Sequence, residues 1–288
     1  MILMSILKGF IFLIFLLAPY AGATEIKQTT YAYWDKPDVE IFYITPKKID
    51  KDTQLLFIIH GNSRNAEDYI SAWIPYISNK NIIVVAPQFN KNSFRYFFLL
   101  ESATSSGKIN NNPDNYINNS ISSFFNFFQS KFSLSTNKYK MFGHSAGAQF
   151  THRYMLLSND RRISNAVIAN AGWYTFLNGN NFPYGIKNSP IDISSDHIKW
   201  FMSNKTSLLI GNNDINLKSV NSSKGAQRQG ITRVDRAESY FNSLINISDN
   251  NNIPFRWSYK VVDKADHDYL KMTPVAAKIL LEDVSPFD

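Results

Sequence analysis

Ser145 lies in the sequence Gly-His-Ser-Ala-Gly at residues 143–147, which has the Gly-x-Ser-x-Gly spacing of a nucleophilic serine. An apolar segment ends directly before this sequence and a segment of helical spacing follows it. We therefore expect a sharp turn that holds the serine hydroxyl clear of a sheet. Both glycines are needed because larger side chains would collide with neighbouring backbone. The alternative is an ordinary turn in which Ser145 caps a helix.

A serine hydroxyl becomes a good nucleophile only when a base removes its proton, and histidine commonly serves as that base. The chain has five histidines. His267 follows the last predicted strand, in a loop that should open at the carboxyl end of a parallel sheet, where ligands bind. We therefore predict that His267 is the base. The alternatives are His197, in an irregular segment, and a solvated role for His267.

The base needs a carboxylate that fixes its tautomer and stabilises its positive charge. In the chain order nucleophile, acid, base, this carboxylate falls between Ser145 and His267. Asp214 stands just past a predicted buried strand, and we assign the role to it. Two alternatives stay open. Asp214 could form only an Asx turn, and Asp266 or Asp268 could serve from an unusual loop.

Attack on a carbonyl places negative charge on its oxygen, which needs preorganised hydrogen-bond donors. The backbone N–H of Ala146, directly after the serine, is one predicted donor. The second is expected just after His60-Gly61, where the glycine permits a close backbone approach, and Asn62 is the predicted donor. His60-Gly61 could instead be no more than a strand-ending turn.

The predicted nucleophile, acid, base and oxyanion donors can meet only if the strands before them lie in one sheet, with their carboxyl ends at the same edge. Apolar runs predict buried strands at residues 54–59, 82–86, 138–142, 165–169, 206–210 and 255–262. Helical spacing is found between them, at residues 66–78, 116–132, 146–157 and 273–281. Two extended stretches, 30–34 and 39–44, come first and predict a hairpin. The sequence therefore predicts an α/β fold: a mostly parallel central sheet with helices on both faces and a leading antiparallel hairpin.

Two segments are expected to lie outside the central sheet and its covering helices. Residues 102–119 are rich in Ser, Asn and Gly and predict a loop. Residues 172–205 lack clear periodicity and predict an irregular insertion over the active-site end of the sheet. Since no repeat or linker divides the chain, we expect a single domain over residues 24–288.

Residues 1–23 have the pattern of a signal peptide, in which Lys8 precedes an apolar run and small residues at 21–23 offer a cleavage site. The apolar run at 10–18 is shorter than the roughly 20 residues that span a bilayer, which disfavours an uncleaved anchor. No other segment has the pattern of a span. We expect an exported protein, periplasmic or extracellular, with no stable membrane insertion after cleavage.

The composition narrows the chemistry further. Zero cysteines exclude disulfides and thiolate metal sites, and no spacing such as His-Glu-x-x-His predicts a metal. The net charge of +7 comes from basic residues scattered among asparagines rather than gathered on one helix face, which argues against nucleic-acid binding.

Two groups of residues beyond the triad could bind substrate. Aromatic residues make up 15% of the chain, and we expect Trp173 and Tyr174 to line an acyl or aryl pocket. Packing in the local core is the alternative for both. Arg233 and Arg236 are expected on a solvated helix face, with an anion site as the alternative.

The chain resembles the α/β-hydrolase family from about residue 54 to 281, because the family's segments occur in order at 60–62, 143–147, 211–214 and the His267 loop. Within that family, Ser-Ala-Gly-Ala at 145–148 and Val-Ala-Pro-Gln at 85–88 are similar to secreted esterases related to polyhydroxybutyrate depolymerases and feruloyl esterases. The resemblance implies hydrolysis of a small or oligomeric ester through an acyl-enzyme. Ser145 would attack, His267 would move the proton, and Asp214 would orient His267. No cofactor is implied.

The same residues allow other reactions. Water, an alcohol and an amine compete for one acyl-enzyme, so an acyltransferase or a peptidase is the first alternative. A catalytically silent binding protein of the same fold is the second. The joint presence of Ser145, Asp214 and His267 argues against this second alternative.

Overall fold

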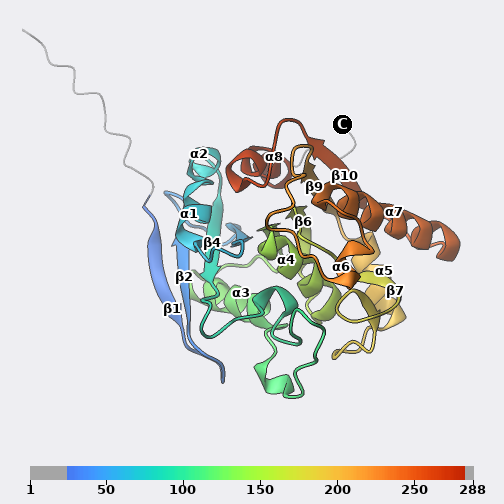
Figure 1. Ribbon diagram of the computed structural model, residues 1–288. Helices are drawn as coiled ribbons and strands as arrows, with labels where there is room; N and C mark the ends of the chain where they lie inside the picture. The colour runs from blue at the N-terminus through green and yellow to red at the C-terminus, as the bar shows by residue number, and fades with distance from the viewer. Residues whose placement is uncertain (1–24, 283–288) are drawn as a thin grey trace, which may run out of the picture.

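The computed structural model describes residues 25–282, so the predicted signal peptide lies outside the described residues. Eight strands form one sheet in the order β1-β2-β4-β3-β5-β6-β9-β10 (Figure 1). They are β1 (Lys27–Tyr31), β2 (Val39–Ile44), β3 (Gln54–Ile59), β4 (Ile82–Gln88), β5 (Tyr139–His144), β6 (Ile163–Ala169), β9 (Thr206–Gly211) and β10 (Trp257–Val262). Every neighbouring pair from β4 to β10 is parallel, whereas β2 is antiparallel to both β1 and β4. The predicted sheet, mostly parallel with a leading antiparallel hairpin, is confirmed.

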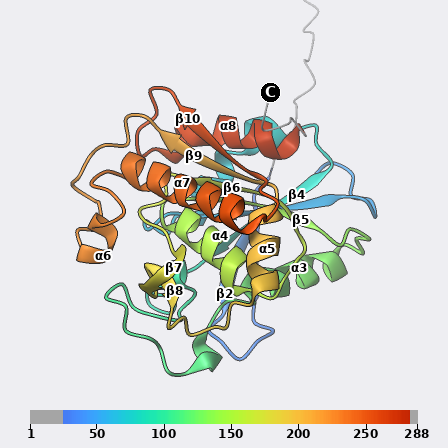
Figure 2. The same ribbon diagram turned by 90° about the vertical axis from the view of Figure 1, so that its right-hand side faces the viewer.

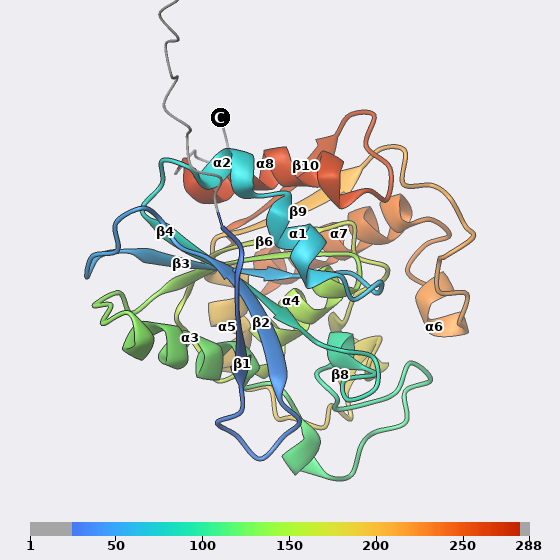
Figure 3. The ribbon, with the colours of Figure 1, turned by 90° about the vertical axis from the view of Figure 1, so that its left-hand side faces the viewer.

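Helices cover both faces of the sheet. One face carries α1 (Ala66–Ser71), α2 (Ile74–Ile77) and α8 (Tyr269–Leu281). The other carries α3 (Ser120–Lys131), α4 (Ala146–Leu157), α5 (Ser195–Ser203) and α7 (Arg233–Asn251), of which α4, α5 and α7 face the viewer in Figure 2. At the edge, β1 and β2 lie in front of the remaining strands in Figure 3. None of the helices within residues 25–282 is both long and apolar enough to cross a bilayer.

Each face of the sheet has its own apolar core. β3 contributes side chains to both cores, which explains its uninterrupted apolar sequence. Successive side chains of a strand point to opposite faces of the sheet. Leu55 and Phe57 therefore join the core under α3 and α4, while Leu56 and Ile58 join the core under α1 and α8. A central strand buried on both faces needs an apolar residue at every position.

The elements differ from the predicted ones near the amino end. β1 covers Lys27–Tyr31 rather than residues 30–34, because the chain turns at Trp34, whose Nε1 donates to Pro37 O at 3.1 Å. The helix predicted at 66–78 is two short helices. Pro75 lies in the first turn of α2, where its missing N–H is tolerated, and a continuous helix would have lost a hydrogen bond there.

The segments predicted as irregular contain some regular structure. Residues 172–205 include a small two-stranded sheet, β7 (Phe176–Asn181) and β8 (Gly185–Lys187), followed by α5. Short turns of helix occur at η1 (Phe97–Leu99), η2 (Pro113–Asn115) and α6 (Lys224–Gln227). The helix expected around Arg233 and Arg236 is the long helix α7, whose first residues carry a capping box between Thr232 and Asp235.

Candidate active site

Ser145, His267 and Asp214 form one hydrogen-bonded series at the carboxyl ends of β5, β10 and β9. Ser145 Oγ is 2.8 Å from His267 Nε2, and His267 Nδ1 is 2.7 Å from Asp214 Oδ2. The Asp214 side chain is fully buried, while His267 is partly exposed. Because a carboxylate can only accept from Nδ1–H, the other ring nitrogen of His267 is left to accept the serine proton.

The turn at Ser145 is strained and tightly enclosed. Ser145 has φ 57° and ψ −116°, a conformation that is uncommon for residues other than glycine. A Cβ added to Gly147 would lie 2.0 Å from Ile59 O, and one added to Gly143 would lie 2.2 Å from Gly147 O. Gly147 is therefore packed against the backbone at the end of β3, and Gly143 against the backbone of α4, so only glycine fits on either side of Ser145. Strain of this kind persists only where the surrounding structure enforces it.

Gly147→Ala is expected to destabilise the protein strongly, by at least about 3 kcal/mol, since the added methyl group meets backbone that cannot move aside. The free energy of unfolding in urea measures the effect. Gly179→Ala is the matched control, because no atom lies within 4 Å of a Cβ at that position. If both variants were as stable as the wild type, the close packing around the turn would be disproved.

The two predicted oxyanion donors are backbone N–H groups of residues that border the cavity at Ser145. Asn62 and Ala146 line the same cavity as the serine, and within residues 25–282 no hydrogen bond engages either N–H group. Ala146 is the first residue of α4, where a backbone N–H has no partner inside the helix. Both predicted donors are thus free to bind an oxygen atom beside Ser145.

His60 anchors the loop that carries Asn62. Its Nε2 accepts from the Phe89 N–H at 3.0 Å, so the neutral ring carries its proton on Nδ1, which donates to Gly61 O at 2.8 Å. Complete burial lowers the pKa of His60 to about 4, and the ring is neutral at physiological pH. His60 therefore acts on the position of the loop and is not a candidate base.

Asn170 connects the loops of the acid and the base, a role that the sequence did not predict. Its Nδ2 donates to Asp266 O at 2.8 Å, and its Oδ1 accepts from the Gly211 N–H at 2.9 Å. A Cβ on Gly211 would lie 2.3 Å from Ala265 O, so these loops touch through their backbones. The side chain of one buried residue thereby fixes the separation between Asp214 and His267.

The surroundings of Arg233 differ from the predicted ones. It was expected on a solvated helix face, yet it is only 3% exposed, and its Nη1 donates to Asp214 Oδ1 at 2.9 Å. Its Nη2 donates to Ser219 O at 3.0 Å. Arg236, 1% exposed, likewise donates to backbone carbonyls, among them Gly172 O at 2.8 Å. The two oxygens of Asp214 are therefore shared between Arg233 and His267.

The alternative acids and base make other contacts, although Asp268 lines the smaller of two cavities that also border Ser145. Asp266 is exposed and binds Lys271 Nζ at 3.0 Å, a contact that lowers the pKa of Asp266. Asp268 caps α8 by accepting from the Leu270 N–H at 2.9 Å. His197 is buried on α5, where burial lowers its pKa, and its ring makes no contact with the triad.

Two cavities meet at the triad. The larger cavity has a volume of about 660 Å³ and lies between the loops that follow β3, β4 and β6. The smaller cavity, of about 460 Å³, is lined by His267 together with Tyr69, His144 and Tyr269. Asn62, Ser145, Ser219 and Arg233 line both cavities.

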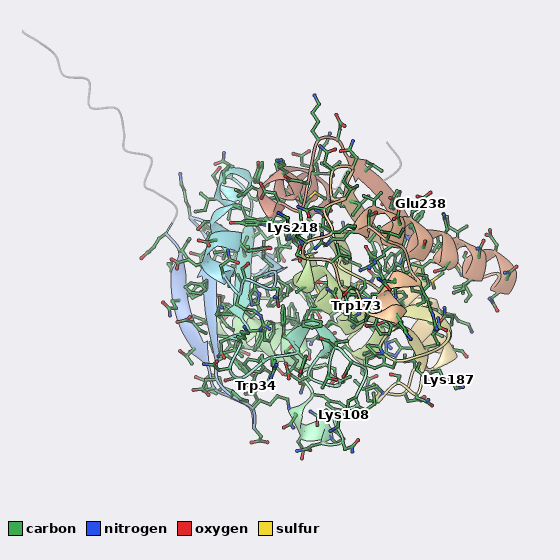
Figure 4. The ribbon with its side chains drawn as sticks, in the orientation of Figure 1. Trp34, Lys108, Trp173, Lys187, Lys218 and Glu238 are labelled. Atoms are coloured by element: carbon green, nitrogen blue, oxygen red, sulfur yellow. The ribbon has the colours of Figure 1, made fainter. Side chains whose placement is uncertain are left out.

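The two aromatic residues predicted to line a pocket have different surroundings. Trp173, labelled in Figure 4, lines the larger cavity. Tyr174 is fully buried, and its ring stacks on Tyr240 with 4.4 Å between the ring centroids. Tyr174 lines neither cavity, so in this structure it is a core residue and presents no surface to a substrate.

Comparisons with known proteins agree with this architecture. No family model matches the chain, and no curated protein matches it by sequence. Among solved structures, the chain is similar to poly(aspartic acid) hydrolase-1 from Sphingomonas sp. KT-1, with 28% identity and a TM-score of 0.83 over 89% of this chain and 98% of that one. It is also similar to LpqC, a poly(3-hydroxybutyrate) depolymerase from Bordetella parapertussis, with 25% identity and a TM-score of 0.82 over 92% of each chain.

More distant structures share the fold. A ferulic acid esterase from Anaeromyces mucronatus has 17% identity and a TM-score of 0.57, over 91% of each chain. The predicted resemblance to polyhydroxybutyrate depolymerases and feruloyl esterases is thus confirmed at the level of structure. The chain is an α/β-hydrolase in fold, and its structural neighbours are hydrolases and esterases.

Proposed function

We propose that the protein is a serine hydrolase that cleaves carboxylic esters through an acyl-enzyme intermediate. The series from Ser145 Oγ through His267 to Asp214 is the observation that carries the proposal. A buried carboxylate behind a histidine that contacts a serine hydroxyl is the arrangement that activates this nucleophile. The strained turn at Ser145 and the free N–H groups of Asn62 and Ala146 support it further.

The proposed reaction follows from these contacts. His267 Nε2 takes the proton of Ser145 Oγ as the oxygen attacks the ester carbonyl, and Asp214 stabilises the resulting imidazolium. The N–H groups of Asn62 and Ala146 donate to the oxyanion. His267 then gives its proton to the leaving alcohol. A water molecule, activated in the same way, releases the acid and restores Ser145.

The positions of the two cavities support an assignment of the two halves of the substrate. The leaving oxygen must receive its proton from His267, which lines the smaller cavity and not the larger one. The alcohol part therefore belongs in the smaller cavity. The acyl part belongs in the larger cavity, beside Trp173 and Gln149.

Amide hydrolysis is a second candidate function. It is favoured by the 28% identity to a protein described as a poly(aspartic acid) hydrolase, whose polymer is joined by amide bonds. The same triad can attack an amide, provided that His267 protonates the leaving amine. Both reactions use the same residues, so the test compares them.

The test measures turnover of 4-nitrophenyl acetate and butyrate beside the matched 4-nitroanilides, with labelling by a fluorophosphonate. We expect turnover of the esters and one covalent label, located on Ser145 by mass spectrometry. Turnover of the anilides at a comparable rate would favour the second candidate. Folded protein that neither cleaves any of these substrates nor takes the label would disprove both.

A further inference from the structure

The larger cavity is lined by basic side chains without acidic ones. Arg64, Lys91, Arg95 and Arg233 line it, and none of the described lining residues is Asp or Glu. Arg233 is paired with Asp214, so its charge is largely balanced. Lys91 and Arg95 are exposed, and neither forms an ion pair within residues 25–282. These two cations are available to a ligand.

Arg64 adds further positive charge to the lining of the larger cavity. Its guanidinium donates to the backbone carbonyls of Phe94 at 2.8 Å and Arg95 at 3.0 Å, which hold it in place without balancing its charge. Glu101 interacts electrostatically with Arg64, and burial raises the pKa of Glu101 to about 7. A carboxyl group that is about half protonated at neutral pH offsets the charge of Arg64 only in part.

A further cation lies directly beneath the cavity. Arg153 is fully buried on α4, and its guanidinium lies 4.1 Å from the ring centroid of Trp173, which lines the cavity. Its Nη1 donates to Phe98 O at 2.8 Å and its Nε to Thr175 Oγ1 at 2.9 Å. Its Nη2 has no hydrogen-bond partner, and it forms no ion pair among the described residues.

A buried charge without a counter-ion is costly, and its field acts over a longer range because water does not screen it. Burial lowers the pKa of Arg153 only to about 9, so the side chain remains charged at neutral pH. The larger cavity thus has positive charge beneath it, at Arg153, and at its exposed lining residues Lys91 and Arg95. Such a cavity concentrates anions and repels cations.

We propose that the larger cavity binds a carboxylate carried by the acyl part of the substrate, facing Lys91 and Arg95. The preferred substrate class is then a monoester of a dicarboxylic acid. Water adds across the ester bond: its oxygen ends on the acyl carbon and a proton on the alcohol oxygen, so the products are a dicarboxylate and an alcohol. This inference rests on the proposed function, because it uses Ser145 as the nucleophile.

The experiment compares monoethyl succinate, glutarate and adipate with their diethyl esters, which differ only in the capped carboxylate. Ethanol release gives kcat/KM per ester bond. We expect the monoester to be preferred by about tenfold at the best-fitting chain length, the value of one charge-assisted hydrogen bond. Raising NaCl from about 0.02 M to about 0.5 M should reduce the preference, since salt screens exposed charges.

Variants test whether Lys91 and Arg95 cause the preference for monoesters. The double variant Lys91→Gln/Arg95→Gln should lose most of the preference, whereas Lys260→Gln, which removes an exposed charge on β10, should keep it. A preference for the diesters at every chain length would overturn the proposal. So would a monoester preference that survives the double substitution. Failure of the proposed function looks different, because then neither ester class nor 4-nitrophenyl butyrate is hydrolysed.

Discussion

Ser145→Ala is expected to lower kcat/KM for 4-nitrophenyl butyrate by about 10⁴-fold or more, since no other group can form the acyl-enzyme. The alanine keeps the Cβ of the turn and removes only the oxygen that contacts His267. The folded state should therefore persist, with an unchanged far-UV circular dichroism spectrum. Residual hydrolysis would reflect the oxyanion donors and substrate binding alone.

The same variant must also lose the fluorophosphonate label. Ser71→Ala is the matched control, because Ser71 is a partly exposed serine on α1 whose hydroxyl donates to the helix backbone at Glu67 O. Full activity and full labelling are expected for this control. If the Ser145 variant kept both activity and label, the nucleophile would have to be another residue, and the proposed mechanism would fail at its first step.

Asp214→Asn is expected to lower kcat by about 10⁴-fold with little change in fold. Arg233 Nη1 donates to Oδ1 in the wild type, so the new amide should turn its oxygen toward Arg233 and its NH₂ group toward His267. His267 Nδ1 must then accept a hydrogen bond. The ring proton moves to Nε2, and the base can no longer take the proton of Ser145.

Asp266→Asn is the matched control for the acid, because Asp266 lies next to His267 in sequence and was the alternative assignment. Its side chain is exposed and pairs with Lys271, while its backbone carbonyl keeps the contact with Asn170 in the variant, so kcat should stay within about twofold of wild type. Rates per active site, counted by phosphonate titration, make the comparison independent of purity. A large loss in the Asp266 variant beside a nearly normal Asp214 variant would reverse the assignment.

The sheet could be predicted from the sequence because its inner strands are buried on both faces. β3 and β9 read as apolar runs, and both occur where the runs predict them. The ends of the first strand were less predictable. Trp34 has high β-propensity and was placed in a strand, but the turn closed by its contact with Pro37 overrides that preference.

The triad could be predicted because each member follows a recognisable strand. The carboxyl ends of parallel strands meet at one edge, so Ser145, Asp214 and His267 were expected to converge, and their distances agree with that expectation. Their catalytic roles stay predictions until the variants are measured. Export through residues 1–23 likewise stays a prediction.

Arg233 and Asn170 could not be found in this way. Both are buried polar residues, and a sequence pattern that equates polar with exposed assigns them to the surface. One signal was present: Tyr240 and Leu244 share a helix face with Arg233, at the spacing of a buried stripe. An arginine on the apolar stripe of a helix requires a buried partner, and here the partner is the predicted acid.

The contact between Arg233 and Asp214 closes a loop of the chain, since the two residues are 19 positions apart and both are anchored. The segment between them supplies Ser219, Val220 and Asn221 to the larger cavity. Its two ends are fixed by an ion pair, and doubling the length of such a loop costs only about 0.6 kcal/mol. A change in the length of this segment would therefore reshape the larger cavity at little cost in loop-closure free energy.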